Sequence, residues 1–366
     1  MSICIAYPNK NLSFSETFIS NHLKFIEHKS ELTGGYYPYL TIDRNSIFQF
    51  PLSIDLLRGG IKNIAPKVYK RLYTLTLSDY LLKTKPSVVL AEYGVTGSMM
   101  TDACKKTSIP LVTHFHGFDA HQYKILEQYK DDYQKMFDYA RTIIVVSEDM
   151  KKELIQIGAD EHKIVNLPYG VDINKFSGAN PENSAPIFIF VGRLTHKKSP
   201  INLIKAFKIV ADEIDDARLV IVGDGELKKQ TLNEIETLNL SAKVELKGVL
   251  SPLQVAEELK KARCFVQHSV RDITGDSEGT PNTILEASGS GLPIISTTHA
   301  GIKEAVVHGH TGLLCAEHDY KAMGQNMLTI AKDKQLAAQM GIKAREHISK
   351  NYNIETQMEK LRQLLY

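Results

Sequence analysis

Short apolar runs rich in β-branched residues alternate with amphipathic segments along the first half of the chain. Strands are predicted for the runs at 3–7, 87–91, 110–114, 142–147 and 164–167. Helices are predicted at 16–28, 61–75, 96–107, 122–140 and 148–158, whereas residues 30–57 show no clear pattern. This alternation predicts a parallel sheet covered by helices on both faces.

The composition changes over 169–186, where glycine, proline, asparagine and serine become frequent, as in a linker. A second series of strands is predicted near 187–191, 218–222, 243–247, 263–267, 293–297 and 312–315, with helices between them. We therefore expect two Rossmann-like domains, and ligands in the cleft between them, at the carboxyl ends of strands. The predicted parts are a domain at 1–172, a linker at 173–186, a domain at 187–350, and a helix at 351–366 that could cross back to the first domain.

The overall composition is that of a soluble globular protein of two domains. Of the 366 residues, 43% are apolar and 23% charged, and the net charge of +2 argues against a general nucleic-acid binder. The four cysteines lack disulfide-framework or metal-ligand spacing, so reduced, structural thiols in a cytoplasmic protein are expected. The N-terminus has no basic region typical of a signal peptide, and no apolar run approaches the ~20 residues of a spanning helix.

The stretch from Asp276 to Gly291 combines a predicted helix start with two carboxylates. Thr280 is a candidate N-cap, Pro281 would occupy the first helical position, and glycines at 289 and 291 would end the helix. The helix N-terminus suits an anion. Glu278 lies just before it and Glu286 about two turns further in, which suggests a ligand with hydroxyls at both ends and phosphate between. The alternative is a capped helix with two surface glutamates.

A basic loop follows the strand predicted at 187–191. Arg193 and Lys198 in this loop could both reach a diphosphate, whereas Lys197 is expected to be solvated. Gly223 lies in another strand-to-helix turn, but a complete dinucleotide fingerprint is absent because position 228 is lysine. Walker A and Asp-x-Asp motifs are also absent, so a diphosphate would be held by the basic residues and the helix end without a metal ion.

The segment His114–Asp119 follows a predicted strand of the first half. Gly117 would let the backbone approach a ligand. His114 and His116 could ligate zinc, but no third ligand has suitable spacing in the sequence. His116, with Asp119 nearby, is better placed to contact a sugar or its leaving phosphate, and His114 is expected in the core. The chain has no Gly-x-Ser-x-Gly elbow, which disfavours a hydrolase.

These motifs together resemble the retaining glycosyltransferases of family 4, which have the GT-B fold. The resemblance rests on 278–286, on Arg193 with Lys198, on 116–119 and on 167–172. The resemblance covers nearly the whole chain. Within the family, the chain looks most like bacterial exopolysaccharide and lipopolysaccharide transferases of the colanic-acid type. One departure is that the first loop lacks the Gly-Gly found in many relatives.

The resemblance implies a role for each matching position. Glu278 would accept hydrogen bonds from the donor sugar, Glu286 would hold the ribose, and Arg193 and Lys198 would stabilise the diphosphate charge. His116 would lie near the transferred sugar. The remaining donor-side positions are Gly279, Thr280, Pro281, Asn282 and Gly223, with Leu250 meeting the base through its backbone. The acceptor-side positions are Ser15, Glu16 and Asp119.

The activity implied is transfer of a hexose from a nucleotide sugar, with retention and without a cofactor or metal, to a glycan or lipid-linked saccharide. The leaving phosphate would help deprotonate the acceptor hydroxyl. A UDP-sugar is favoured over a GDP-sugar because UDP is the commoner donor base among such relatives. Two alternatives stay open, a nucleotide-sugar epimerase of the same fold and a non-catalytic nucleotide-sugar-binding protein.

The region 58–85 has a strongly basic character. It contains seven lysines and arginines against one acid, Asp79, with tyrosines interleaved. A basic amphipathic helix can dock on an anionic membrane surface, although such a segment is also typical of a core helix with a solvated polar face. The resemblance favours docking, and hence a cytoplasmic protein peripheral to the membrane.

Overall fold

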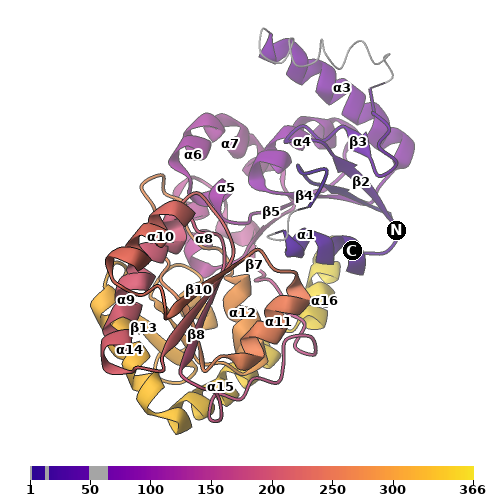
Figure 1. Ribbon diagram of the computed structural model, residues 1–366. Helices are drawn as coiled ribbons and strands as arrows, with labels where there is room; N and C mark the ends of the chain where they lie inside the picture. The colour runs from indigo at the N-terminus through magenta and orange to yellow at the C-terminus, as the bar shows by residue number, and fades with distance from the viewer. Residues whose placement is uncertain (1, 13–15, 49–64) are drawn as a thin grey trace. The chain divides into compact units, whose positions relative to one another are not determined.

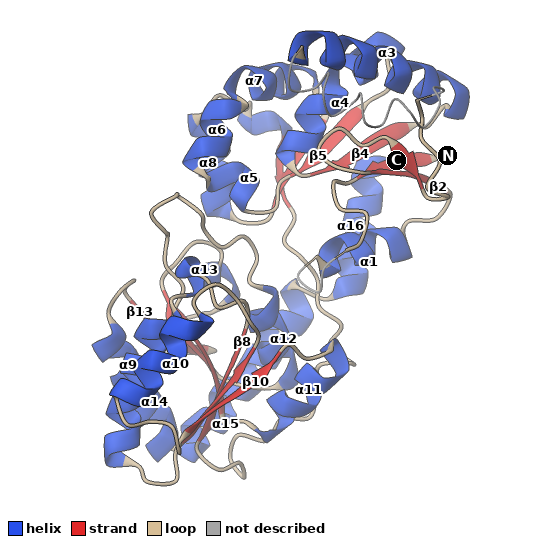
Figure 2. Cartoon of the chain, turned by 45° about the horizontal axis from the view of Figure 1, so that its top comes forward, coloured by secondary structure: helices blue, strands red, loops and turns tan. Residues whose placement is uncertain are grey.

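The computed structural model of the protein describes residues 2–12, 16–48 and 65–366. The chain forms two compact units (Figure 1). The first comprises Met1–Val146, Met150–Leu167 and Met358–Tyr366, and the second comprises Ser147–Asp149 and Pro168–Gln357. In each unit a sheet lies between layers of helices, as Figure 2 shows.

The first unit contains a seven-stranded sheet in the order β3-β2-β1-β4-β5-β6-β7. Its strands are β1 Ile3–Ala6, β2 Lys29–Thr33, β3 Leu40–Thr41, β4 Val88–Glu92, β5 Leu111–His114, β6 Thr142–Val145 and β7 Ile164–Asn166. The five strands predicted from the apolar runs are confirmed. The prediction of an all-parallel sheet is wrong at one edge, where β3 pairs antiparallel with β2.

Helices α1 Thr17–Phe25, α3 Pro66–Thr84, α4 Gly94–Thr107, α5 Phe118–His121, α6 Tyr123–Gln128, α7 Lys130–Tyr139, α8 Glu148–Gln156 and α16 Ile354–Leu365 accompany this sheet. The single helix predicted over 122–140 is two helices, because the chain leaves helical geometry at Tyr129. Of the helix predicted at 61–75, the part before residue 65 lies outside the described residues. No described helix is both long and apolar enough to cross a membrane.

The second unit contains a six-stranded, entirely parallel sheet in the order β10-β9-β8-β11-β12-β13. Its strands are β8 Ile187–Val191, β9 Arg218–Val222, β10 Val244–Gly248, β11 Cys264–Gln267, β12 Ile294–Thr297 and β13 Gly312–Cys315. All six agree with the sequence prediction to within one residue at each end. The helices are α9 Pro200–Glu213, α10 Lys228–Thr237, α11 Pro252–Lys261, α12 Asn282–Ser290, α13 Ile302–Ala305, α14 Tyr320–Lys332 and α15 Lys334–Asn351.

The core of the second unit has two layers, one on each face of the sheet. Successive strand residues point to opposite faces, so Phe188 and Phe190 of β8 pack in one cluster with α9 and α14. Ile189 and Val191 pack in the other, with residues of α11 and α12. Burial on both faces explains why β8 is a continuous apolar run.

The strand order determines where a ligand site can form in this sheet. The chain leaves β8 toward β9 on one side, whereas β11 lies on the other side of β8. Neighbouring strands whose connections run in opposite directions leave a crevice at their carboxyl ends. The loops after β8 and β11 both leave the sheet at this point.

Candidate functional site

The loop between β11 and α12 is held in shape by hydrogen bonds to one aspartate. The Asp272 carboxylate accepts from the backbone N–H of Thr274 at 2.7 Å and of Asp276 at 3.1 Å. His299, which follows β12, holds Ser277 and Glu278 of this loop. Its Nε2 lies 3.0 Å from Ser277 Oγ and accepts from the N–H of Glu278 at 3.2 Å. Glu278 is therefore fixed through its backbone before any ligand binds.

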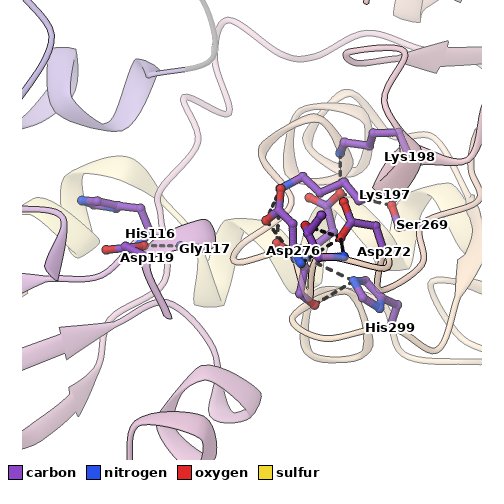
Figure 3. A network of polar contacts seen from close by, with 12 residues as sticks. His116, Gly117, Asp119, Lys197, Lys198, Ser269, Asp272, Asp276 and His299 are labelled. Carbon is purple, nitrogen blue, oxygen red and sulfur yellow. Dashed lines mark hydrogen bonds and ion pairs between the residues drawn. The ribbon is translucent and has the colours of Figure 1, made fainter. Parts of the chain in front are cut away.

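The Glu278 carboxylate forms an ion pair with Lys198, which comes from the loop after β8 (Figure 3). Lys198 Nζ lies 3.0 Å from Glu278 Oε1, and the two side chains are only 12% and 8% exposed. Burial raises the pKa of the Glu278 carboxyl, but the charges on Lys198 and Lys197 outweigh it and hold this pKa at about 2. Burial lowers the pKa of Lys198, and Glu278 partly offsets that shift. Glu278 is thus an ionised acceptor at neutral pH.

A short chain of hydrogen bonds lies behind the Glu278 carboxylate. Thr283 Oγ1 donates to Gln267 Oε1 at 3.3 Å, and Gln267 Nε2 donates to Ser269 Oγ at 2.8 Å. Ser269 Oγ in turn donates to Glu278 Oε1 at 3.3 Å. Every donor points toward the carboxylate, so each bond polarises the next and favours the ionised form.

Lys197 is not solvated, contrary to the sequence expectation. Its ammonium lies 3.2 Å from Asp276 Oδ1 and donates to the carbonyl of Ser277 at 3.2 Å. The prediction failed because the partner carboxylate lies on the loop after β11, far along the sequence. Lys197 thus holds the loop that carries Glu278, while Arg193 is exposed.

The turns after β8 and β9 touch through their backbones. Gly223 has φ of +135°, and a Cβ at this position would lie 1.9 Å from the carbonyl oxygen of Gly192. The Gly223 N–H donates to the carbonyl of Gly248 at 2.7 Å. Only glycine allows this close approach. Gly223 therefore lets the turn after β9 pack against the backbone of Gly192, which directly precedes Arg193.

Helix α12 begins at Asn282, one residue later than predicted. Pro281 takes the N-cap position with ψ of 85°, outside helical geometry, and Thr280 does not cap the helix. The Thr280 hydroxyl instead accepts from the N–H of Tyr169 at 3.3 Å. The helix ends as predicted at Gly291, in left-handed conformation, although Gly289 lies inside it.

Glu286 is partly buried on α12. Its backbone carbonyl accepts from Ser290 Oγ at 2.9 Å, but no hydrogen bond or ion pair joins its carboxylate to the described residues. Burial raises the pKa of its carboxyl to about 7, against a smaller opposing effect of Lys175. Lys175 also borders a surface pocket of about 760 Å³. The pocket is lined by Leu250 and Lys247, among others.

In the first unit, the segment predicted around His116 is held by Asp119. The Asp119 carboxylate accepts from the N–H groups of His116 at 3.0 Å, Gly117 at 2.9 Å and Gly94 at 2.8 Å. Burial raises the pKa of Asp119, and His116 acts against that shift. The Asp119 carboxylate therefore holds the backbone of the loop that carries His116.

The His116 imidazole lies against a glutamate that the sequence did not single out. His116 Nε2 lies 2.8 Å from Oε2 of Glu92, the last residue of β4, and the His116 side chain is only 2% exposed. His22 of α1 contacts the other carboxylate oxygen at 2.7 Å. Burial raises the pKa of Glu92, but His22 and His116 outweigh it, so this pKa is lowered overall.

Of the acceptor-side positions, Ser15 lies outside the described residues. Glu16 directly precedes α1 and is buried. Its carboxylate accepts from Asn9 Nδ2 at 2.5 Å and from the Tyr93 hydroxyl at 3.2 Å. Sequence reasoning missed four polar residues of the two units that lie at or just after strand ends, a position that was the available signal: Gln267, Ser269, His299 and Glu92.

Known proteins resemble the chain over most of its length. It matches the family model "Glycosyl transferases group 1" over residues 172–347 and the model "Glycosyltransferase Family 4" over residues 57–175. WcaL of Escherichia coli (strain K12), named as a colanic acid biosynthesis glycosyltransferase, is 30% identical over 258 residues, or 70% of this chain and 64% of WcaL. The match thus spans less than two thirds of that relative.

Another relative aligns over more of its own length. The UDP-Gal:alpha-D-GlcNAc-diphosphoundecaprenol alpha-1,3-galactosyltransferase of Escherichia coli is 28% identical over 310 residues, or 79% of this chain and 78% of that protein. Among solved structures, Anabaena Alr3699/HepE superposes with a TM-score of 0.78 over 100% of this chain and 99% of its own, at 16% identity. The predicted GT-B fold is confirmed by this likeness and by the two sheets. The two family matches together run from residue 57 to 347, and the chain belongs to glycosyltransferase family 4.

Proposed function

We propose that the chain is a retaining glycosyltransferase that moves a hexose from a UDP-sugar to a saccharide hydroxyl during synthesis of a cell-surface polysaccharide. The observation that carries the proposal is the buried Lys198–Glu278 pair, where the loops after β8 and β11 leave the sheet. It combines a cation for phosphate with an ionised acceptor for sugar hydroxyls.

The chemistry of the pair follows from its charges. A donor diphosphate would replace Glu278 as the partner of Lys198, and exposed Arg193 would supply a second cation. The Glu278 carboxylate would then accept hydrogen bonds from the sugar hydroxyls. As the bond from the sugar to the β-phosphate breaks, these cations stabilise the charge that develops on the phosphate oxygen. The new bond forms to the acceptor oxygen, whose proton passes to the leaving phosphate, and no metal ion takes part.

The nucleotide part of the proposal rests on Glu286 and Leu250. The Glu286 carboxylate has no hydrogen-bond or ion-pair partner among the described residues, and ribose hydroxyls would supply the donors that it lacks. Leu250 lines the pocket of about 760 Å³ and offers backbone groups to a base. HepE was solved in complex with UDP and with UDP-glucose, which supports UDP over GDP.

A panel of UDP, GDP and ADP, followed by their sugars, tests the proposal by thermal shift. A ligand at 100-fold its dissociation constant adds about 2.7 kcal/mol of stability, so the preferred base is readily identified. Purified protein with the selected donor should then release UDP slowly without an acceptor, and Glu278→Gln should release none above background. Isomerised donor as the sole product would identify an epimerase, and binding without UDP release would identify a non-catalytic binder.

We also propose that the acceptor is lipid-linked and that the protein docks on the anionic cytoplasmic face of a membrane through α3. The related galactosyltransferase is named for a diphosphoundecaprenol acceptor. Exposed apolar residues follow one face of α3: Val68, Leu72, Leu75 and Leu82. Exposed cations accompany them, namely Lys67, Arg71, Lys83 and Lys85, against Asp79 alone.

Apolar side chains flanked by cations complement an anionic lipid surface, where each cation contributes about 1 kcal/mol. Flotation at low salt should recover the protein with phosphatidylglycerol vesicles and not with phosphatidylcholine vesicles. Reversal of Lys67 and Arg71 to glutamate should abolish the binding. Reversal of Lys105 and Lys106, exposed on α4, should not. Equal flotation of both variants would refute docking through α3.

A further inference from the structure

Four nitrogen- and oxygen-bearing side chains converge inside the first unit. Glu92 ends β4 and His114 ends β5, and the two residues are direct partners in the parallel pairing of these strands. His22 comes from α1, and His116 lies two residues beyond β5. The cluster is thus assembled from three elements that are distant in the sequence.

The contacting atoms of this cluster surround one small volume. His22 Nδ1 lies 2.7 Å from Glu92 Oε1, and His116 Nε2 lies 2.8 Å from Glu92 Oε2. His114 Nδ1 is 3.7 Å from the same Oε2 atom. One ligand atom from each of His22, Glu92 and His114 lies within 4.8 Å of the others.

The cluster is almost sealed from solvent. The side chains of His22, His114 and His116 are each 2% exposed, and that of Glu92 is 0% exposed. Buried ionised groups in proteins are paired or coordinate metal ions. Imidazole nitrogen and carboxylate oxygen are the donors, besides thiolate, that zinc uses.

We propose that His22, Glu92, His114 and His116 form a structural site for a divalent transition metal, with zinc the best match. Zn–N and Zn–O bonds of about 2.0–2.1 Å put neighbouring tetrahedral ligands about 3.3 Å apart. The observed separations of 2.7, 2.8 and 3.7 Å bracket that value. These separations place an ion within reach of His22, Glu92 and His114, and His116 would complete the set as the fourth ligand.

Four protein ligands leave no position for water, which is typical of structural rather than catalytic zinc. The surroundings orient the ligands as outer contacts do in metal sites. The Phe18 ring stacks on His116 with centroids 4.1 Å apart, and Asp119 holds the His116 backbone N–H at 3.0 Å. The metal would fix the end of β5 and the loop that follows it, independently of any transfer activity.

Metal binding by the full-length, tag-free protein tests the site. After chelator treatment and dialysis, titration with ZnCl₂ should show one ion bound per chain and raise Tm by several degrees. Co²⁺ in its place should give the visible absorption of a four-coordinate ion. Both measurements use the unaltered chain, so they do not depend on how a variant folds. Less than stoichiometric Zn²⁺, with no change in Tm, would overturn the proposal and leave a metal-free hydrogen-bonded cluster.

Variants locate the ion. Glu92→Gln and His22→Asn should each weaken Zn²⁺ binding by more than about 100-fold, beyond the loss typical of outer-shell changes. Glu27→Gln and His162→Gln serve as matched controls, since both side chains are exposed on the same unit, and they should bind like the wild type. Undiminished binding in folded Glu92→Gln would refute this ligand set, whatever the protein's activity.

Discussion

Two carboxylates, that of Glu278 in the loop before α12 and that of Glu286 on α12, lie in opposite environments. Glu278 has a lysine at 3.0 Å and a serine hydroxyl at 3.3 Å, and its pKa is held at about 2. The carboxylate of Glu286, eight residues further on, has no hydrogen-bond or ion-pair partner among the described residues, and burial raises its pKa to about 7.

The difference predicts that the two carboxylates would respond differently to the proposed donor. Glu278 is already ionised and fixed, so a ligand exchanges one set of partners for another. If the proposed ribose contact forms, the Glu286 carboxylate would gain its first donors from the ligand, which would lower its pKa and release a proton near neutral pH. The first arrangement suits preorganised stabilisation of charge, and the second couples affinity to pH.

The largest effect is expected from removing the partner of Glu278. Lys198→Met should lower the rate of UDP release from the donor by about 10²–10³-fold or more, because a cation facing the leaving phosphate is lost. The free energy of unfolding should fall by about 3 kcal/mol, since a buried carboxylate loses its ion pair. Denaturant unfolding of the nucleotide-free protein measures this loss.

The double variant Lys198→Met/Glu278→Gln separates these two effects. It should regain most of the stability lost in the single variant, because no uncompensated charge is left buried. It should not regain activity. If the double variant were as unstable as Lys198→Met, the pair would not be the electrostatic unit that the geometry indicates.

Arg193→Ala gives the matched case of an exposed cation from the same loop. We expect UDP release to fall by about 10–100-fold, because one of two phosphate-facing charges is removed. Tm without nucleotide should stay as in the wild type, since Arg193 is exposed and surface substitutions change stability by about ±0.5 kcal/mol. A rate equal to that of the wild type would remove Arg193 from the donor site.

Glu286→Gln should raise the stability of the protein, whereas Lys198→Met should lower it. The carboxyl's pKa is about 7 in the folded protein against an ordinary value of 4.5, so the native state holds the proton more tightly. Stability therefore falls as pH rises from 4.5 through 7. The glutamine variant should be more stable by ~1–3 kcal/mol at pH 8, with the gain disappearing toward pH 4.5.

The same variant should bind UDP about tenfold more weakly at pH 8, because a charged hydrogen-bond acceptor is replaced by a neutral one. Calorimetric titration with UDP measures the affinity. Glu236→Gln, on the exposed face of α10, is the control and should change neither property. Unchanged UDP affinity in Glu286→Gln would place the ribose elsewhere.

The central strands of the sheets could be predicted because they are buried on both faces. All five residues of β4 are buried, and such strands are continuous apolar runs. Strand β2, with the sequence Lys-Ser-Glu-Leu-Thr, could not be predicted in this way. Its position is fixed by pairing with β1, which a local pattern does not reveal.

Site residues could be predicted where they lie in one sequence motif. They could not be predicted where the fold pairs residues that are distant in the sequence. Arg193, Lys198 and Glu278 could be chosen from their positions after strands. Which lysine pairs with which acid could not, because Lys197 and Asp276 are far apart in the sequence. The zinc alternative at His114 and His116 was set aside for want of a third ligand in the sequence, and the residues that we propose as further ligands, His22 and Glu92, lie on α1 and β4.

The smallest effect is expected three hydrogen bonds away from Glu278, at Thr283. Thr283→Val removes the first donor of the chain through Gln267 and Ser269 without changing side-chain size much. The lost bond is long, at 3.3 Å, so stability should fall by less than about 1 kcal/mol. UDP release should slow about two- to fivefold if the chain polarises the carboxylate cooperatively. Thr329→Val, exposed on α14, is the matched control. A rate loss equal in both variants would mean that the preorganisation of Glu278 depends on Lys198 and His299 alone, which would sharpen the contrast with Glu286.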